Sequence, residues 1–138
     1  MKIPIAKPNS ELSDIKNFES RFIKEVHKGI YIGGENVKSY EEDLKNFLNV
    51  KYVASLNSGT DALVLSLFSM GIKPGDEIIL PSFTYFATAE AVMHVGAIPV
   101  FADVEKNSYC ISANTVEKLI TKKTRCIIPV HLYGYDSD

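Results

Sequence analysis

Short apolar runs alternate with helix-length segments through most of the chain, and this alternation constrains the fold more than any other feature. The predicted strands cover residues 52–56, 77–80, 98–102 and 125–132, and the predicted helices cover residues 61–70, 84–95 and 113–120. Strands that alternate with helices of about ten residues are typical of βαβ units and a parallel sheet. The almost wholly apolar run at 77–80 favours a strand covered on both faces. We therefore predict an α/β fold, a partial three-layer sandwich with a mostly parallel sheet.

The first fifty residues carry a different pattern, with apolar residues at three- and four-residue steps. This spacing predicts amphipathic helices over residues 11–28 and 37–48, and Gly29 fits the end of the first helix. We therefore predict two parts, an N-terminal helical segment at residues 1–50 and the first part of an α/β domain at residues 51–138.

The charge balance and the two cysteines argue against several classes of function. The 138 residues carry a formal net charge of -2, and Lys122–Lys123 is the only basic pair, so nothing indicates nucleic-acid binding. There is no run of about 18 apolar residues and no apolar signal-peptide core at the N-terminus, so we expect no membrane span and a cytoplasmic location. Cys110 and Cys126 are too far apart for a CxxC motif, and no histidine has metal-ligand spacing beside them, so we expect reduced cysteines and no metal site.

The strongest local signal is the run from Leu56 to Leu63, LNSGTDAL, where a predicted strand passes through small residues into a helix. The first N–H groups of a helix lack intrahelical partners, and the helix dipole favours negative charge there. Gly59 lets a ligand approach the backbone and Thr60 adds a hydroxyl donor, so the turn can hold a phosphate. The alternative is an ordinary helix N-cap, because Ser or Thr before an apolar helix is common. The run contains neither a P-loop nor a GxGxxG fingerprint.

A second candidate is the run from Pro81 to Ala89, PSFTYFATA, which directly follows the predicted strand at 77–80. Ligands of open α/β sheets bind beyond the carboxyl ends of the strands, where an aromatic side chain can stack on a flat ring. The alternative places Phe83, Tyr85 and Phe86 in the core and at a helix entry.

His131 and Tyr133 come near the carboxyl end of the last predicted strand, where site residues could also collect. For His131 we favour a structural role, such as orienting the backbone, over catalysis. His27 and His94 fall on predicted helices and are expected at the surface.

The two candidate runs, taken with four others, resemble the DegT/DnrJ/EryC1/StrS family of sugar aminotransferases. The other matching runs are EEDLKNFL at residues 41–48, GIKPGDEII at 71–79, GAIPVFADV at 96–104 and IIPVHLYG at 127–134. Each run is weak alone, but together they follow the family's order and spacing over nearly the whole chain. The resemblance implies the large domain of a fold-type-I aminotransferase that uses pyridoxal 5'-phosphate (PLP), in agreement with the predicted fold.

The resemblance also implies which residues contact the cofactor. In the family the Ser-Gly-Thr turn holds the PLP phosphate, which makes Gly59 and Thr60 the implied contacts and Ser58 a third. The aromatic residue after the family's SFT motif stacks on the pyridine ring, and here that residue is Tyr85. The family more often has Trp or Phe at this position, but Tyr keeps the flat face.

The implied activity is amino transfer, with L-glutamate as the donor and a nucleotide-linked keto-sugar as the acceptor, in amino-sugar, cell-surface polysaccharide or glycoside biosynthesis. Full-length members are usually homodimers. The runs NSGTDAL and FTYFATAEAV lean toward relatives that act on 3-keto sugars, while 4-keto sugars remain an alternative.

In the family, the lysine that bonds PLP and the acid that pairs with the pyridine nitrogen follow the HLYG strand, beyond Asp138. None of the lysines present lies in a motif that matches the family's PLP-bonding lysine. The resemblance therefore implies no catalytic residue within this chain, which is expected to be inactive alone. The alternative is a truncated, non-catalytic α/β module that binds phosphate ligands or a partner chain.

Overall fold

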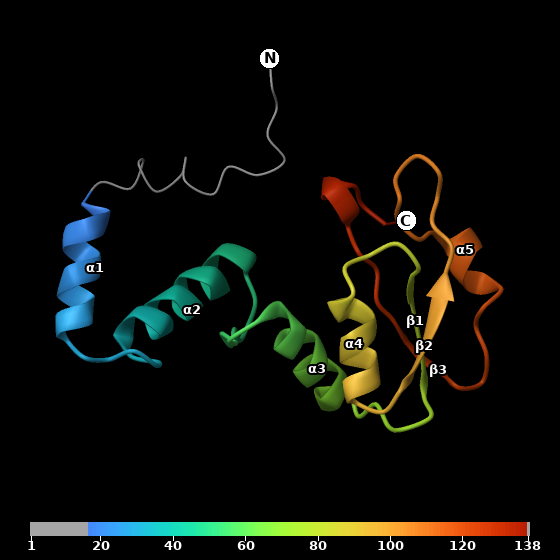
Figure 1. Ribbon diagram of the computed structural model, residues 1–138, viewed down its shortest axis with the longest axis horizontal. Helices are drawn as coiled ribbons and strands as arrows, with labels where there is room; N and C mark the ends of the chain where they lie inside the picture. The colour runs from blue at the N-terminus through green and yellow to red at the C-terminus, as the bar shows by residue number, and fades with distance from the viewer. Residues whose placement is uncertain (1–16, 138) are drawn as a thin grey trace, which may run out of the picture. The chain divides into compact units, whose positions relative to one another are not determined.

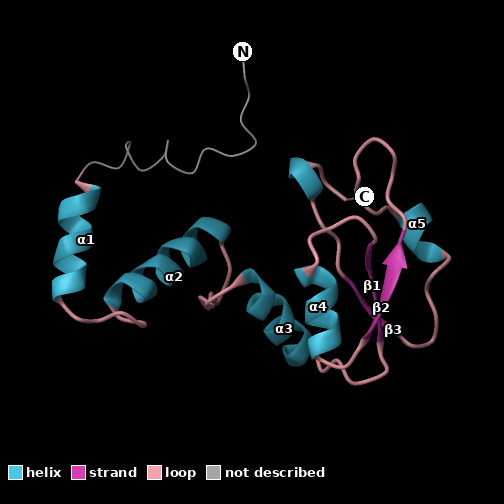
Figure 2. Cartoon of the chain, in the orientation of Figure 1, coloured by secondary structure: helices cyan, strands magenta, loops and turns pink. Residues whose placement is uncertain are grey.

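A computed structural model describes residues 17–137 (Figures 1 and 2). The chain divides into two compact units, at Met1–Ser55 and Leu56–Asp138. The predicted boundary lay five residues earlier, and the assignment of these parts as domains stays a prediction.

The first unit contains two helices, α1 at Phe18–His27 and α2 at Glu35–Leu48. The predicted first helix began at residue 11, and its residues 11–16 lie outside the described part of the chain. Gly29 has a φ of 68° and its N–H bonds the carbonyl of Val26, so α1 ends at the predicted glycine in the left-handed conformation. Neither helix has a buried residue.

The second unit alternates helices with strands in the predicted order. Its elements are α3 at Gly59–Ser69, β1 at Glu77–Pro81, α4 at Ala87–His94, β2 at Ile98–Ala102, α5 at Ala113–Glu117, β3 at Thr124–Ile127 and the 3-10 helix η2 at Leu132–Gly134. The three strands form a parallel sheet in the order β2-β1-β3. In this register Ile79 of β1 lies between Val100 and Ile127.

The central strand β1 faces a separate apolar cluster on each side of the sheet. Ile78 and Leu80 pack in one cluster with Leu67 of α3 and Val92 of α4. Ile79 points to the other cluster, whose members include Val116 of α5. Complete burial of such a side chain contributes about 1.5–3 kcal/mol. Helices therefore cover both faces of a parallel sheet, and the predicted α/β sandwich is confirmed.

The predicted strand at 52–56 is wrong, because these residues form no ladder with any described strand. A strand needs a neighbour to exchange backbone hydrogen bonds. The Ser55 N–H instead donates to the carboxylate of Glu41, at 2.7 Å.

Several other boundaries also differ from the prediction, and the largest differences are in α4, α5 and β3. Helix α4 begins at Ala87, three residues later than predicted, and α5 ends at Glu117, three residues earlier. Strand β3 covers Thr124–Ile127 instead of 125–132. The Ile128 N–H still bonds the Ile79 carbonyl at 2.8 Å, after which the chain leaves the sheet and enters η2.

Candidate functional site

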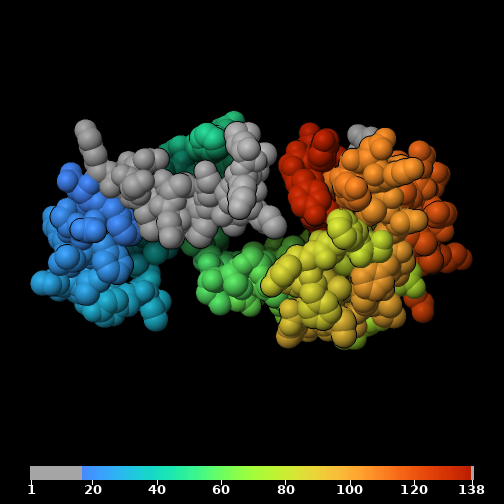
Figure 3. Space-filling model, turned by 45° about the horizontal axis from the view of Figure 1, so that its top comes forward, coloured from blue at the N-terminus to red at the C-terminus, as the bar shows by residue number. Residues whose placement is uncertain are grey.

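The carboxyl ends of β1, β2 and β3 lie at the same edge of the sheet, because all three strands are parallel. The arrow of β2 in Figure 1 points toward this edge. Three loops leave it, at residues 82–86, 103–112 and 128–131. In the space-filling view the yellow-green, orange and red atoms of these parts lie together at one end of the unit (Figure 3). Ligands of open α/β folds bind at such an edge.

Helix α3 opens with the predicted Ser-Gly-Thr turn. Ser58 is the N-cap residue, and its hydroxyl accepts the Asp61 N–H at 3.1 Å and donates to the Asp61 carboxylate at 2.9 Å. The N–H groups of Gly59 and Thr60 occupy the first helical positions, which have no intrahelical acceptor. The sequence left an N-cap and a phosphate cradle as alternatives, and the structure shows that the capping contacts are made.

Space for a ligand is open beside this turn. A Cβ atom built on Gly59 would meet no atom within 4 Å. Thr60 is half-buried. The Ser58 hydroxyl is engaged by its cap. The backbone N–H groups of Gly59 and Thr60, together with the Thr60 hydroxyl, can donate to an anion.

Tyr85 lies in the loop between β1 and α4, with 81% of its surface exposed. Phe83 and Phe86 are also exposed, so none of these three aromatics lies in the core. Phe86 is the N-cap residue of α4, so the alternative is right only in placing an aromatic at a helix entry. Both ends of the loop are fixed: the Ser82 N–H bonds the Ala102 carbonyl at 2.8 Å, and the Tyr85 carbonyl accepts the Thr88 N–H at 3.1 Å. The Tyr85 ring thus stands on an anchored loop with its faces available to a ligand.

An aromatic cluster joins Phe83 of the 82–86 loop, Tyr109 of the 103–112 loop and Tyr133 of η2. The ring centroids of Phe83 and Tyr109 are 5.8 Å apart, and those of Tyr109 and Tyr133 are 6.3 Å apart at 90°. These separations are typical of attractive aromatic pairs. Sequence reasoning named Tyr133 only by its place near a strand end and missed Tyr109, since no spacing pattern connects the three.

His131 has a structural contact, as predicted. Its Nδ1 accepts the Ser137 N–H at 3.1 Å, and the Ser137 hydroxyl bonds the Val130 carbonyl at 3.3 Å. The ring therefore fixes the segment that follows η2. His27 and His94 are exposed on their helices, also as predicted.

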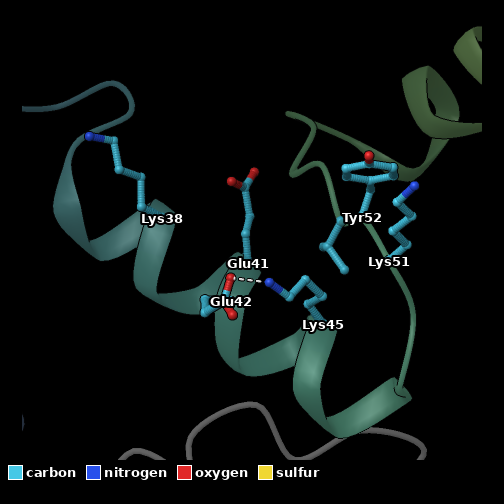
Figure 4. A pocket seen from close by; sticks show the side chains of 7 residues that line it. Lys38, Glu41, Glu42, Lys45, Lys51 and Tyr52 are labelled. Carbon is cyan, nitrogen blue, oxygen red and sulfur yellow. Dashed lines mark hydrogen bonds and ion pairs between the residues drawn. The ribbon is translucent and has the colours of Figure 1, made fainter.

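A polar groove in the first unit is the other hollow of note (Figure 4). Two of its lysines are in ion pairs, because Lys45 bonds Glu42 at 2.6 Å and Lys38 bonds Glu35 at 3.0 Å. The Lys51 ammonium lies 5.2 Å from the centre of the Tyr52 ring. Exposed ion pairs of this kind contribute little stability.

Among residues 17–137, no group of three His, Cys, Asp or Glu side chains could hold a metal ion. No helix in the same part of the chain has the length and apolar character to cross a membrane. Burial raises the pKa of the Cys126 thiol, so it favours the neutral thiol.

The fold is that of α/β proteins whose ligands bind at the carboxyl edge of a parallel sheet. The chain belongs to the DegT/DnrJ/EryC1/StrS aminotransferase family, whose sequence model matches residues 13–138.

Two curated relatives illustrate the similarity. UDP-2-acetamido-2-deoxy-3-oxo-D-glucuronate aminotransferase of Pseudomonas aeruginosa is 40% identical over 136 residues, which cover 93% of this chain and 38% of the relative. 3-Oxo-glucose-6-phosphate:glutamate aminotransferase of Bacillus subtilis is 36% identical over 130 residues, which cover 94% of this chain and 29% of the relative. The chain therefore spans about a third of the length of these relatives.

Solved structures agree with the family assignment. DesV of S. venezuelae matches 99% of this chain and 37% of its own, with a TM-score of 0.91 and 33% identity. NtdA of Bacillus subtilis, solved with bound cofactor PMP, matches 99% of this chain and 32% of its own, with a TM-score of 0.84 and 34% identity.

Proposed function

We propose that this chain supplies the phosphate and ring contacts for PLP in an aminotransferase that acts on a nucleotide-linked keto-sugar. The observation that carries the proposal is the N-terminus of α3, where Gly59 leaves open space beside helix N–H groups. The relatives support it, since one solved neighbour holds PMP and another, Spr1654 of Streptococcus pneumoniae, was solved in a PLP form.

Four residues have distinct roles in this proposal. The N–H groups of Gly59 and Thr60 and the Thr60 hydroxyl donate to the phosphate, whose charge the helix dipole favours. Ser58 caps α3 through Asp61 and so keeps those N–H groups in place. Tyr85 covers one face of the pyridine ring. PLP, when bound, supplies the electron sink that amino transfer needs.

The names of the relatives support a 3-keto acceptor. Both names contain a 3-oxo sugar. The sugar is linked to UDP in the name of the Pseudomonas aeruginosa relative. It is phosphorylated at position 6 in the name of the Bacillus subtilis relative, which also includes glutamate. This agrees with the lean of NSGTDAL and FTYFATAEAV toward 3-keto sugars. We propose a nucleotide-linked 3-keto sugar as acceptor, L-glutamate as donor, and a cytoplasmic homodimer as the full-length form.

We further propose that the lysine that bonds PLP is not among the lysines of these 138 residues. Lys51, Lys73, Lys122 and Lys123 are exposed, and none of them lies in a run that matches the family's PLP-bonding lysine motif. Incubation with PLP, reduction with borohydride and peptide mass spectrometry should then show scattered, substoichiometric labelling. Stoichiometric labelling of one lysine, together with transaminase turnover, would refute this proposal.

The phosphate contact is tested by Gly59→Ala. The Cβ of a first-turn residue points toward the helix N-terminus, so the methyl group occupies the space where the phosphate should sit. We expect PLP to bind roughly 10- to 100-fold more weakly, the equivalent of losing about one hydrogen bond to a charged group. Fluorescence titration with PLP measures this.

Folding should not suffer in Gly59→Ala, which separates binding from stability. Gly59 is helical and the added Cβ meets nothing within 4 Å, so stability should rise by about 0.4–1 kcal/mol. Ser66→Ala, later in the same helix, is the matched control and should leave PLP affinity unchanged. Equal affinity in wild type and Gly59→Ala would argue against the phosphate cradle.

A further inference from the structure

Tyr109 has an unusual backbone conformation for its residue type. Its φ is 58°, in the left-handed region that favours glycine or asparagine. A bulky residue in this conformation strains the backbone, which indicates that contacts of its side chain elsewhere in the structure offset the strain.

The turn that contains Tyr109 is fixed by groups other than its ring. The Tyr109 N–H bonds the Glu105 carbonyl at 2.9 Å, and the Glu105 N–H bonds the Cys110 carbonyl at 2.9 Å. The Ser112 hydroxyl also donates to the Glu105 carboxylate at 2.6 Å. Because backbone bonds close this turn, glycine at position 109 could keep its shape with less strain.

The Tyr109 ring connects the loop after β2 with the segments that follow the other two strands. It lies 5.8 Å from the Phe83 ring and 6.3 Å from the Tyr133 ring, and Tyr133 too has a positive φ, of 55°. Phe83 is two residues before Tyr85. Hydrogen bonds hold the two ends of the 82–86 loop, and the Thr84 and Thr88 hydroxyls are hydrogen-bonded at 3.1 Å. The Phe83–Tyr109 contact adds a restraint on the residue before Thr84.

We infer that Tyr109 is a positioning residue, whose ring holds Phe83 and thereby fixes the loop that presents Tyr85. The inference rests on the proposed role of Tyr85 in covering the PLP ring. Tyr109 does not itself touch the cofactor in this arrangement. A merely structural Tyr109 would stabilise the unit without any specific effect on Tyr85.

The test compares Tyr109→Gly with Tyr109→Phe in the full 138-residue chain labelled with 15N-tyrosine. NMR relaxation should show the Tyr85 amide order parameter falling from about 0.85 to about 0.6 or below in Tyr109→Gly. Tyr109→Phe keeps the ring and should restore the wild-type value. The Tyr52 amide, in the other compact unit, is the internal control and should not change.

A second variant removes the same contact from the opposite side. Phe83→Leu keeps an apolar group but loses the ring pair, so it should loosen Tyr85 as Tyr109→Gly does. The inference is overturned if Tyr85 stays ordered in both folded variants, or if one variant does not fold and the other leaves Tyr85 ordered. It is also overturned if Tyr109→Phe loosens Tyr85 as much as glycine does.

Circular dichroism of bound PLP adds a readout that depends on the proposed function. At saturating PLP, Tyr109→Gly should reduce the induced band at least twofold, while Gly59→Ala should lower affinity and leave the saturated band unchanged. A wild-type chain that fails to bind PLP would refute the cofactor proposal alone, because the relaxation experiment requires no ligand. If the Tyr85 amide of Tyr109→Gly is more mobile but the induced band is unchanged, the role of Tyr109 in presenting the Tyr85 ring to PLP is refuted.

Discussion

The two compact units of this chain obtain their structure from different sources. In the N-terminal unit α1 and α2 have no buried residue, and aromatic side chains such as Phe47 remain exposed. In the C-terminal unit Ile78, Ile79 and Leu80 of β1 are wholly buried. Local signals, such as the glycine at the end of α1, therefore determine where the helices of the first unit lie in the sequence. Packing on both faces of a sheet determines the structure of the second unit.

The sharpest test of this contrast pairs Ile79→Ala with Phe47→Ala. Ile79 has no exposed surface, so its truncation leaves a cavity and should lower the free energy of unfolding by about 2–5 kcal/mol. Phe47 is 84% exposed, and its truncation should change that free energy by less than about 0.5 kcal/mol. Urea unfolding of the full chain measures both, and similar losses would show that the first unit has a core of its own.

A smaller effect is expected at the N-terminus of α3, where local capping acts inside the packed unit. Ser58→Ala removes both hydrogen bonds to Asp61 and should lower the free energy of unfolding by about 1 kcal/mol. Ser66→Ala, on the exposed surface of the same helix, serves as the control. A loss in the control equal to that in Ser58→Ala would mean that the cap is not the cause.

The smallest effect belongs to an exposed carboxylate in the N-terminal unit. The hydrogen bonds from Lys28 and then from Asn36 lower the pKa of Glu25 below its ordinary value of 4.5. The contribution of ionised Glu25 to the stability of the folded chain is therefore present above about pH 4.5 and is lost as the pH falls through the lowered pKa.

Carboxyl 13C NMR titration of the full chain measures this pKa directly. Lys28→Met should raise it toward 4.5 by more than Asn36→Ala does, since the lysine has the larger influence. The reverse order would show that the amide, and not the ammonium, controls this carboxylate.

Sequence patterns predicted the parts of the fold that depend on one continuous segment. The range of β2 was predicted to the residue, and β1 is only one residue longer than predicted. The strand at 52–56 could not be excluded from its apolar pattern, because a ladder depends on a partner elsewhere in the chain. The start of α4 was misplaced because Tyr85 and Phe86 continue the apolar run although they lie in an exposed loop.

The candidate site also has one part that the sequence could indicate and one part that only the folded structure reveals. The Ser-Gly-Thr turn is contiguous, so the sequence could indicate both its N-cap and the open backbone at Gly59. The aromatic cluster joins regions that follow three different strands. Neither the left-handed backbone of Tyr109 nor its contact with Phe83 leaves a periodic signal, so only the folded structure reveals them.

The order β2-β1-β3 also bears on how the C-terminal unit folds. Strand β1 meets β2 after a single intervening helix, α4, whereas its pairing with β3 must also close over β2 and α5. Because the entropy lost on closing a loop increases with its length, we expect β1, α4 and β2 to associate first. The addition of β3 would then complete the sheet, and η2 follows β3 in the chain. We therefore expect the Tyr133 ring to contact Tyr109 after the Phe83 ring does.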